Sequence, residues 1–239
     1  MSNFAPIVDF HAHVLPAADH GSAGLTDTKH QLALYRKEGV DTVVATPHFY
    51  PNSVSIDAFL AMEDSAAAEL SELIATEQQA SPRVLLGAEV LYCDHIHHME
   101  GIERLCIRGT NVLLLELPLS SGKWSSTLFH TVRELSKRFC VVLAHIDRYT
   151  RAHADDLMAL IEDGALAQVN AYALTSLFER RRLAPFFECG AVVALGSDLH
   201  KVDASAVQKL IRAKKQLGED YDEIMARAME LLKDSKSIS

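Results

Sequence analysis

In the segment IVDFHAH, residues 7–13, a short apolar run ends on two histidines. Five later apolar runs also end on a residue that can bind a metal. They are 42–47 before His48, 84–88 before Glu89, 112–115 before Glu116, 141–144 before His145, and 192–197 before Asp198 and His200. Parallel strands buried on both faces have such continuous apolar runs, and an α/β barrel gathers their carboxyl ends at one mouth. The sequence therefore predicts a polynuclear metal site at the carboxyl ends of parallel strands.

Segments with helical patterns separate the apolar runs. Helices are predicted over 26–37, 55–78, 125–138, 154–162, 175–189, 204–215 and 221–233, and a further strand over 165–170. Alternating strands and helices favour parallel strands joined by right-handed crossovers. Seven strands result, in one α/β domain that spans residues 1–239. The last six residues, 234–239, are expected to form a frayed tail.

The overall charge is acidic. The chain has 23 Lys and Arg against 32 Asp and Glu, a net charge of −9, which argues against a broad nucleic-acid or anionic-membrane surface. No apolar stretch approaches the roughly 20 residues that span a bilayer. No secretion signal precedes the first strand, and the four cysteines form no CxxC pair. We therefore expect a cytoplasmic protein with reduced thiols and no membrane insertion.

The residues at the strand ends have the chemistry of a metal centre. In a strand, residues i and i+2 face the same side, so His11 and His13 can grip one ion, and Asp198 and His200 repeat that spacing. Buried imidazoles and carboxylates must be paired or ligated. His20, on the loop after the first strand, is a further candidate ligand, and Asp19 is a weaker one. The alternative is that these residues only form a turn and bind no metal. The remaining histidines at 95, 97, 98, 130 and 153 are interpreted as surface residues.

Several segments carry a family resemblance: HAHVLP, DHG, TPHFY, GAEV, LLELP, AHIDRY, QVNAYAL and GSDLH. In this order they resemble the PHP (polymerase and histidinol phosphatase) family, and most closely its manganese-dependent tyrosine-protein phosphatase branch of the CpsB and YwqE type, which is associated with capsular polysaccharide control. The resemblance covers nearly the whole chain. It departs from that branch at one position, because His20 stands where the branch usually has the second Asp of Asp-Asp-Gly.

The resemblance implies a distorted (β/α)7 TIM-like barrel, the PHP fold, with three divalent metal ions. Manganese is the first expectation, and iron or zinc would also suit these ligands. Carried over by position, His11, His13, Glu89 and Asp198 hold one ion, Glu89, Glu116 and His145 a second, and His20, His48 and His200 a third. Glu89 then bridges two ions, and a hydroxide between them attacks phosphorus.

A metal-dependent phosphatase is the function that follows, with phosphotyrosine in proteins as its first substrate. Arg148 is the expected phosphate clamp because a guanidinium fork matches phosphate oxygens. Asn170 is expected either to orient substrate or a bridging water, or to make a strand-terminal hydrogen bond. The acid for the leaving oxygen stays open between His48 and Asp198. Two alternatives remain: a phosphatase of a small ester such as histidinol phosphate or a nucleotide, and a metal-binding PHP domain without turnover. The sequence leaves the oligomeric state open.

Overall fold

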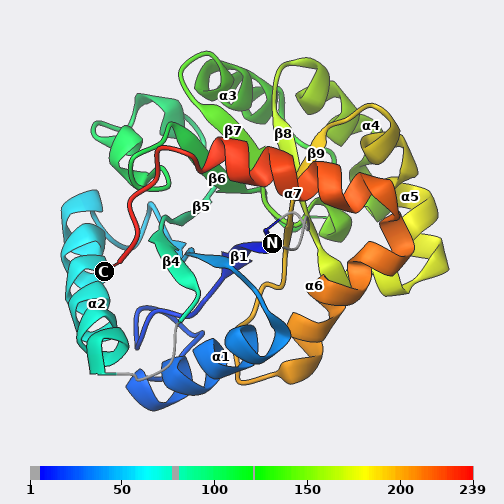
Figure 1. Ribbon diagram of the computed structural model, residues 1–239. Coiled ribbons are helices and arrows are strands. Elements are labelled where there is room, and N and C mark those ends of the chain that lie inside the picture. The colour runs from blue at the N-terminus through cyan, green and yellow to red at the C-terminus, as the bar shows by residue number, and fades with distance from the viewer. Residues whose placement is uncertain (1–5, 77–80, 121, 239) are drawn as a thin grey trace.

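Nine parallel strands form the centre of the computed structural model, which describes residues 6–76, 81–120 and 122–238. Figure 1 shows these strands in the middle of the molecule with the helices around them. The strands are β1 (Val8–Ala12), β2 (Thr42–Ala45), β3 (His48–Phe49), β4 (Arg83–Leu86), β5 (Glu89–Leu91), β6 (Val112–Glu116), β7 (Cys140–Leu143), β8 (Leu166–Asn170) and β9 (Val192–Gly196).

The strands follow one another in space as they do in the chain. One sheet has the order β1-β2-β4 and the other the order β3-β5-β6-β7-β8-β9, with every pair parallel. The segment after β9 reaches the end of β1. Asp198 N–H donates to the carbonyl of His11 at 2.9 Å, and His13 N–H donates to the carbonyl of Leu199 at 3.0 Å. The expected α/β architecture with parallel strands is confirmed, and its first and last strands lie side by side.

Two of the seven predicted strands are each followed by an additional short strand that begins at the predicted ligand, β3 at His48 and β5 at Glu89. Pro47 separates β2 from β3, and Gly87 and Ala88 separate β4 from β5. Proline has no N–H for the ladder, so it marks the point where the strand leaves one sheet and enters the next. Two bonds continue across the break, from Gly87 N–H to Ala45 O and from Glu89 N–H to Pro47 O, both at 3.0 Å. The break therefore turns His48 and Glu89 toward the same mouth.

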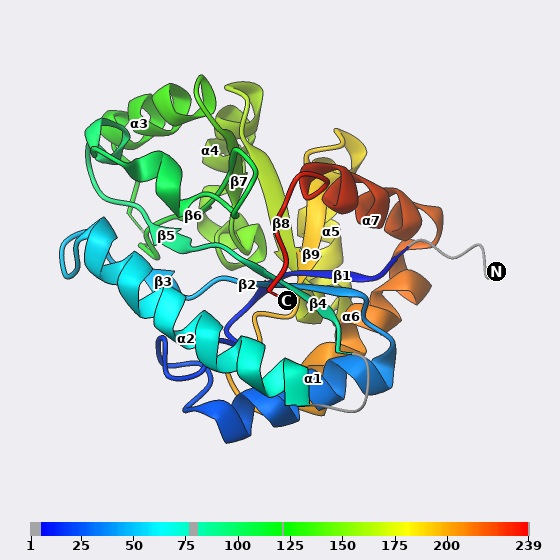
Figure 2. The ribbon, with the colours of Figure 1, turned by 60° about the vertical axis from the view of Figure 1, so that its left-hand side comes forward.

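Seven α-helices surround the strands in the described residues. They are α1 (Leu25–Glu38), α2 (Ile56–Thr76), α3 (Ser126–Ser136), α4 (Thr150–Glu162), α5 (Leu177–Glu188), α6 (Ala204–Leu217) and α7 (Glu219–Leu231). Figure 2 shows α1 and α2 along one side, with α3 and α4 grouped above them. Residues 77 and 78 of the predicted second helix lie outside the described residues. The predicted fourth helix begins four residues early, at Thr150, and is kinked at His153.

The predicted frayed tail is wrong for residues 234–238. Ser237 forms an antiparallel bridge to Leu85, and Ile238 N–H donates to the carbonyl of Val84 at 2.9 Å. Arg83 also donates to the carbonyl of Ser235 at 2.6 Å. β4 pairs with β2 on one edge only, so its other edge has free backbone groups that the tail satisfies. The C-terminus thus covers a sheet edge.

One apolar core runs through the whole described chain, from Val8 on β1 to Leu232 after α7. The strand residues between these ends are almost entirely buried, as expected for parallel strands covered by helices. No helix in the described part of the chain is both long and apolar enough to cross a bilayer. Polar side chains collect outside this core, at the carboxyl ends of the strands.

Candidate metal centre

The nine candidate ligands named from the sequence lie together at the carboxyl ends of the strands. They come from β1 and its loop, from β3, β5 and β6, and from the segments after β7 and β9. The residues are His11, His13, His20, His48, Glu89, Glu116, His145, Asp198 and His200. Pairwise contacts among their side chains join all nine into one cluster.

Oxygen acceptors fix the orientation of both histidines on β1. Nδ1 of His13 donates to Asp19 Oδ2 at 2.6 Å, and Nδ1 of His11 donates to Gln168 Oε1 at 3.3 Å. Each ring therefore presents its Nε2 toward the cluster. Histidines that bind metals typically donate their other ring N–H to an oxygen in this way, which fixes the tautomer.

Glu89 is the centre of the cluster. Its Oε2 lies 3.2 Å from His11 Nε2, 3.4 Å from His13 Nε2 and 2.9 Å from His48 Nδ1. Its Oε1 lies 2.7 Å from His145 Nε2. The two carboxylate oxygens thus face two different groups of imidazoles, which is the arrangement that a bridging ligand requires.

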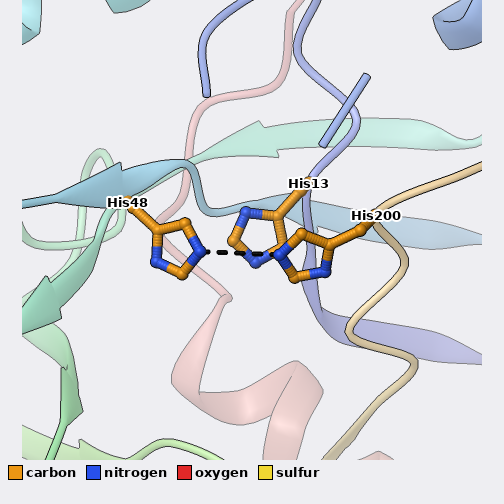
Figure 3. A group of neighbouring side chains, drawn as sticks. All are labelled: His13, His48 and His200. Carbon is orange, nitrogen blue, oxygen red and sulfur yellow. Dashed lines mark hydrogen bonds between the residues drawn. The ribbon is translucent and has the colours of Figure 1, made fainter. Parts of the chain in front are cut away.

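Three histidines from distant parts of the chain form a second group. Figure 3 shows the rings of His13, His48 and His200 gathered together, with Nε2 of His48 3.5 Å from Nε2 of His200. The ring of His20 lies 4.6 Å, between centroids, from both His48 and His200. His20 is thus beside this group, but in the described residues the closest trio of ligand atoms here contains His13 instead.

The spacing of the donor atoms fits a bound cation. Nε2 of His11 and of His13 lie 3.2 Å apart, and they lie 3.8 and 3.5 Å from Asp198 Oδ1. Donors at about 2.1 Å from one tetrahedral ion are separated by about 3.4 Å. Two imidazole nitrogens that are both lone-pair acceptors repel one another, and a cation between them removes the repulsion.

Unpaired atoms support the same conclusion. Oε2 of Glu89, Nδ1 of His48 and Nδ1 of His145 are buried without a hydrogen-bond partner in the structure. Although Glu89 and His48 approach to 2.9 Å, their geometry is not that of a hydrogen bond. Leaving such groups unsatisfied costs about 1–3 kcal/mol each. A divalent cation bound between Glu89 and His48 would satisfy the first two of these atoms, so these residues fit a metal.

The electrostatics also favour cations. Burial opposes the ionisation of Glu89, yet His11, His13 and His145 outweigh it and hold the pKa of its carboxyl well below the ordinary value. Burial and the charge of Glu89 raise the pKa of Glu116. Two carboxylates that disfavour each other's ionisation at one site can share a cation instead.

Two of the candidate ligands have unusual backbone conformations. His145 has φ 33° and Asp198 has φ 53°, in the left-handed region that residues other than glycine seldom adopt. Such conformations cluster at functional sites because the surrounding structure holds them. Two glycines give the cluster room: a Cβ at Gly196 would lie 2.8 Å from His11 Cβ, and one at Gly21 would lie 2.3 Å from His13 Cβ.

Sequence reasoning singled out Asn170 but missed Gln168 and Asp9, which also support the ligands. Gln168 on β8 is fully buried and accepts from His145 N–H at 2.6 Å as well as from His11. Its own amide donates to Asn170 Oδ1 at 3.0 Å, and Asn170 Nδ2 donates to Asp198 Oδ2 at 3.1 Å. The signal that could have revealed this series of hydrogen bonds is a glutamine and an asparagine two residues apart in an apolar strand. Asp9 is also buried, and accepts from Tyr35 Oη at 2.7 Å.

A cavity of about 600 Å³ opens beside the cluster. Its polar wall includes Glu116, three of the histidines, Lys201 and Arg148, and its apolar wall consists of Leu91, Leu117, Leu119 and the ring of Tyr50. Arg148 donates to Asp198 Oδ2, and its Nη1 lies 3.5 Å from His145 Nε2. The predicted phosphate contact therefore lies at the edge of both the cluster and the cavity.

A parallel α/β barrel with imidazoles and carboxylates at the carboxyl ends of its strands is the arrangement of PHP-type metal-dependent phosphoesterases. The chain belongs to the CpsB/CapC family of capsular polysaccharide synthesis, whose sequence model matches residues 7–235.

Two curated relatives match over most of their length. The tyrosine-protein phosphatase YwqE of Bacillus subtilis is 25% identical over 242 residues, which cover 97% of this chain and 93% of YwqE. The tyrosine-protein phosphatase CpsB of Streptococcus pneumoniae is 24% identical over 217 residues, with 83% and 84% of the two chains covered.

Solved structures share the fold. One from work on YwqE and CpsB, described as metal-dependent tyrosine phosphatases, has a TM-score of 0.78 at 23% identity and covers 96% of each chain. Histidinol phosphate phosphatase from Lactococcus lactis, solved with zinc, L-histidinol and phosphate, has a TM-score of 0.58 at 13% identity and covers 89% of this chain and 94% of its own.

Proposed function

We propose that this chain is a metal-dependent phosphatase that hydrolyses phosphotyrosine in proteins. The observation that carries the proposal is Glu89, whose two oxygens face His11 and His13 on one side and His145 on the other. The family of the chain and the activity named for YwqE and CpsB agree with it.

The nine clustered residues would hold three divalent cations, with manganese proposed first and iron or zinc as alternatives. His11, His13, Glu89 and Asp198 would hold the first ion, and Glu89, Glu116 and His145 the second. His48 and His200 would hold the third, together with His20. Such ions neutralise the charge of a phosphomonoester and supply hydroxide near neutral pH.

Arg148 is proposed to bind the phosphate oxygens. Its guanidinium has five N–H donors in a planar fork, and Asp198 occupies one side of that fork. The remaining donors lie at the edge of the cavity, where the substrate phosphate would enter.

The apolar wall of the cavity suits the aromatic ring of a phosphotyrosine substrate. Tyr50 stacks on His48 with ring centroids 5.3 Å apart, and Leu119 is 65% exposed beside it. Large apolar side chains that stay in water beside polar ligands are typical of binding sites. A phenyl ring attached to the phosphate would cover them. We propose that these two residues contact the tyrosine ring.

A small phosphate ester is the second candidate substrate. His20 supports it, because the tyrosine phosphatase branch usually has aspartate at this position. A metal-binding domain without turnover is the third candidate function.

We propose a single catalytic domain over residues 1–239 in the cytoplasm, where the four free thiols would stay reduced.

The test compares kcat/KM for a phosphotyrosyl peptide and for histidinol phosphate in the manganese-loaded protein. We expect the peptide to be preferred, and Leu119→Ser to raise its KM several-fold without changing hydrolysis of histidinol phosphate. Leu177→Ser is the matched control, because this exposed leucine lies on α5 and does not line the cavity. Equal or greater efficiency on histidinol phosphate would favour the second candidate, and metal retention without any hydrolysis would favour the third.

A further inference from the structure

The first and last strands meet at a junction that has candidate ligands on both sides. β1 packs against β9, but no ladder of backbone hydrogen bonds joins these two strands in the described sheets. One isolated bridge links Ala12 to Leu199. We call this junction the seam. The two histidines of residues 11–13 lie on one side of it and Asp198 and His200 on the other, so the spacing of four candidate ligands depends on what holds the seam together.

A buried carboxylate bridges the seam. Oδ1 of Asp9, on β1, accepts a hydrogen bond at 2.9 Å from the backbone N–H of Ser197, the residue before Asp198. The same oxygen accepts from the N–H of His11 at 3.3 Å. Asp9 is fully buried, so no bulk water is present to replace either bond. The side chain of Asp9 therefore takes the part that a backbone carbonyl has in a continuous ladder.

The hydroxyl of Tyr35, on α1, completes the network. It donates to Asp9 Oδ2 at 2.7 Å, and it lies 3.0 Å from Ser197 Oγ. Because its proton is used on Asp9, the serine hydroxyl is the donor of the second bond. Tyr35 is fully buried and contacts both sides of the seam. We call Asp9, Tyr35 and Ser197 the seam triad.

The backbone of Asp198 requires such support. With φ 53° it lies in the left-handed region, which persists in residues other than glycine only where the surrounding structure holds it. Its N–H donates to the carbonyl of His11 at 2.9 Å, and the preceding N–H, that of Ser197, donates to Asp9. Two consecutive N–H groups are thus fixed to β1, one by the backbone and one by the seam triad.

We propose that the seam triad is a positioning device for the metal centre, which sets the distance between the ligands on β1 and the ligands after β9. The inference rests on the proposed function only in requiring that the cluster binds divalent cations, and it does not require hydrolysis of phosphotyrosine. Groups that orient metal ligands from behind typically contribute 10–100-fold to metal affinity. Tyr35 acts on the metal through Asp9 and Ser197 and is therefore a positioning residue.

Calorimetric titration of the metal-free full chain with manganese tests the proposal. Tyr35→Phe removes one hydroxyl of the triad and keeps the buried ring, and Ser197→Ala is a smaller change that removes the other. Tyr221→Phe is the matched control, because this tyrosine is also buried but its hydroxyl has no hydrogen-bond partner in the structure. Circular dichroism and the unfolding temperature show whether each metal-free variant is folded. The visible spectrum of bound cobalt reports the arrangement of the metal ligands.

We expect Tyr35→Phe to bind manganese about 10-fold more weakly than wild type. Ser197→Ala should bind it several-fold more weakly, and Tyr221→Phe should bind it like wild type. Of the two tyrosine variants, only Tyr35→Phe should change the cobalt spectrum.

A purely structural role for the triad would lower the unfolding temperature of Tyr35→Phe but leave its manganese affinity and cobalt spectrum unchanged, and this result would overturn the proposal. Unchanged affinity and spectrum in a folded Ser197→Ala would overturn it too, whether or not Tyr35→Phe folds. Wild type that bound manganese without hydrolysing any phosphoester would contradict the proposed function alone, because the comparison of affinities would still decide the role of the triad. Wild type that bound no metal would overturn both.

Discussion

Asp19 Oδ2 accepts a hydrogen bond from Nδ1 of His13 at 2.6 Å, although the sequence pointed to its neighbour His20 as the ligand of this loop. The same carboxylate accepts from the backbone N–H of His48 at 3.0 Å and, through Oδ1, from that of Gly21 at 2.8 Å. Asp19 therefore connects the loop to two candidate ligands. Its role is to fix the tautomer and the orientation of His13.

Replacing Asp19 with asparagine should weaken metal binding without unfolding the protein. Asparagine has one oxygen where aspartate has two, so it cannot accept from Gly21 N–H and from His13 Nδ1 at the same time, and the ring of His13 loses its fixed orientation. Loss of such a supporting group typically costs 10–100-fold in metal affinity. Calorimetric titration with manganese should show this decrease for Asp19→Asn and no change for Asp155→Asn, an exposed control on α4. An unchanged affinity for Asp19→Asn would show that His13 does not depend on Asp19.

Glu89→Gln should remove most of the activity while the fold persists. The substitution keeps the size of this buried side chain but removes the charge that faces His11 and His145. Losing about 4 kcal/mol of transition-state stabilisation lowers kcat/KM by about 1,000-fold. Steady-state rates on an aryl phosphate, with circular dichroism as a check of folding, test this. A folded variant with near wild-type rates would remove Glu89 from the centre of the site.

Arg148→Lys should mainly affect phosphate binding. Lysine keeps the positive charge but cannot contact both Asp198 and a phosphate with a planar fork. Hydrogen bonds to charged groups contribute about 1.5–3 kcal/mol, so kcat/KM should fall by roughly 10- to 100-fold. Arg151→Lys, an exposed arginine three residues further on, is the control and should be neutral. If both variants behaved alike, Arg148 would not be the phosphate contact.

Ionisation of Tyr221 should lower the stability of the protein at alkaline pH. Burial and the nearby charge of Asp222 raise the pKa of Tyr221 to about 12, above the ordinary value near 10. Its contribution to stability is fully present below pH 10 and is lost as the pH rises toward 12, because the unfolded chain releases the proton first. Tyr221→Phe removes a buried hydroxyl that has no hydrogen-bond partner in the structure.

Urea unfolding at pH 8 and pH 11 measures this effect. The free energy of unfolding should fall between the two pH values by roughly 1 kcal/mol less in Tyr221→Phe than in wild type. The other tyrosines are common to both proteins and cancel in the comparison. An identical decrease in both proteins would mean that Tyr221 ionises as easily in the folded state as in the unfolded one.

The strands and the strand-end residues could be predicted from the sequence because both depend on local pattern. A buried parallel strand is a continuous apolar run, and the residue after it must lie at the mouth. His48, Glu89 and Glu116 were found by this reasoning alone. The same pattern could not show the breaks at Pro47 and Gly87, because these depend on which neighbouring strand each half pairs with.

Contacts between distant segments explain the remaining differences. The C-terminal tail is polar and looks frayed by composition, but Ile238 bonds to the edge of β4 over 150 residues away in the chain. Gln168 has no special local signature, yet it supports two ligands from different strands. His97 and His153 were expected on the surface but are buried, and the ring of His97 lies 5.4 Å, between centroids, from that of His130 on α3. Sequence spacing does not contain these juxtapositions.

The metal dependence of phosphotyrosine hydrolysis is the decisive measurement for this site. The protein is treated with chelator, desalted and shown by elemental analysis to be free of metal, and its rate on a phosphotyrosyl peptide is measured before and after addition of manganese. We predict that the rate falls at least 100-fold without metal and returns when manganese is added to wild type but not to Glu89→Gln. Metal-free protein that hydrolysed the peptide at the original rate would contradict the assignment of this cluster as the catalytic centre.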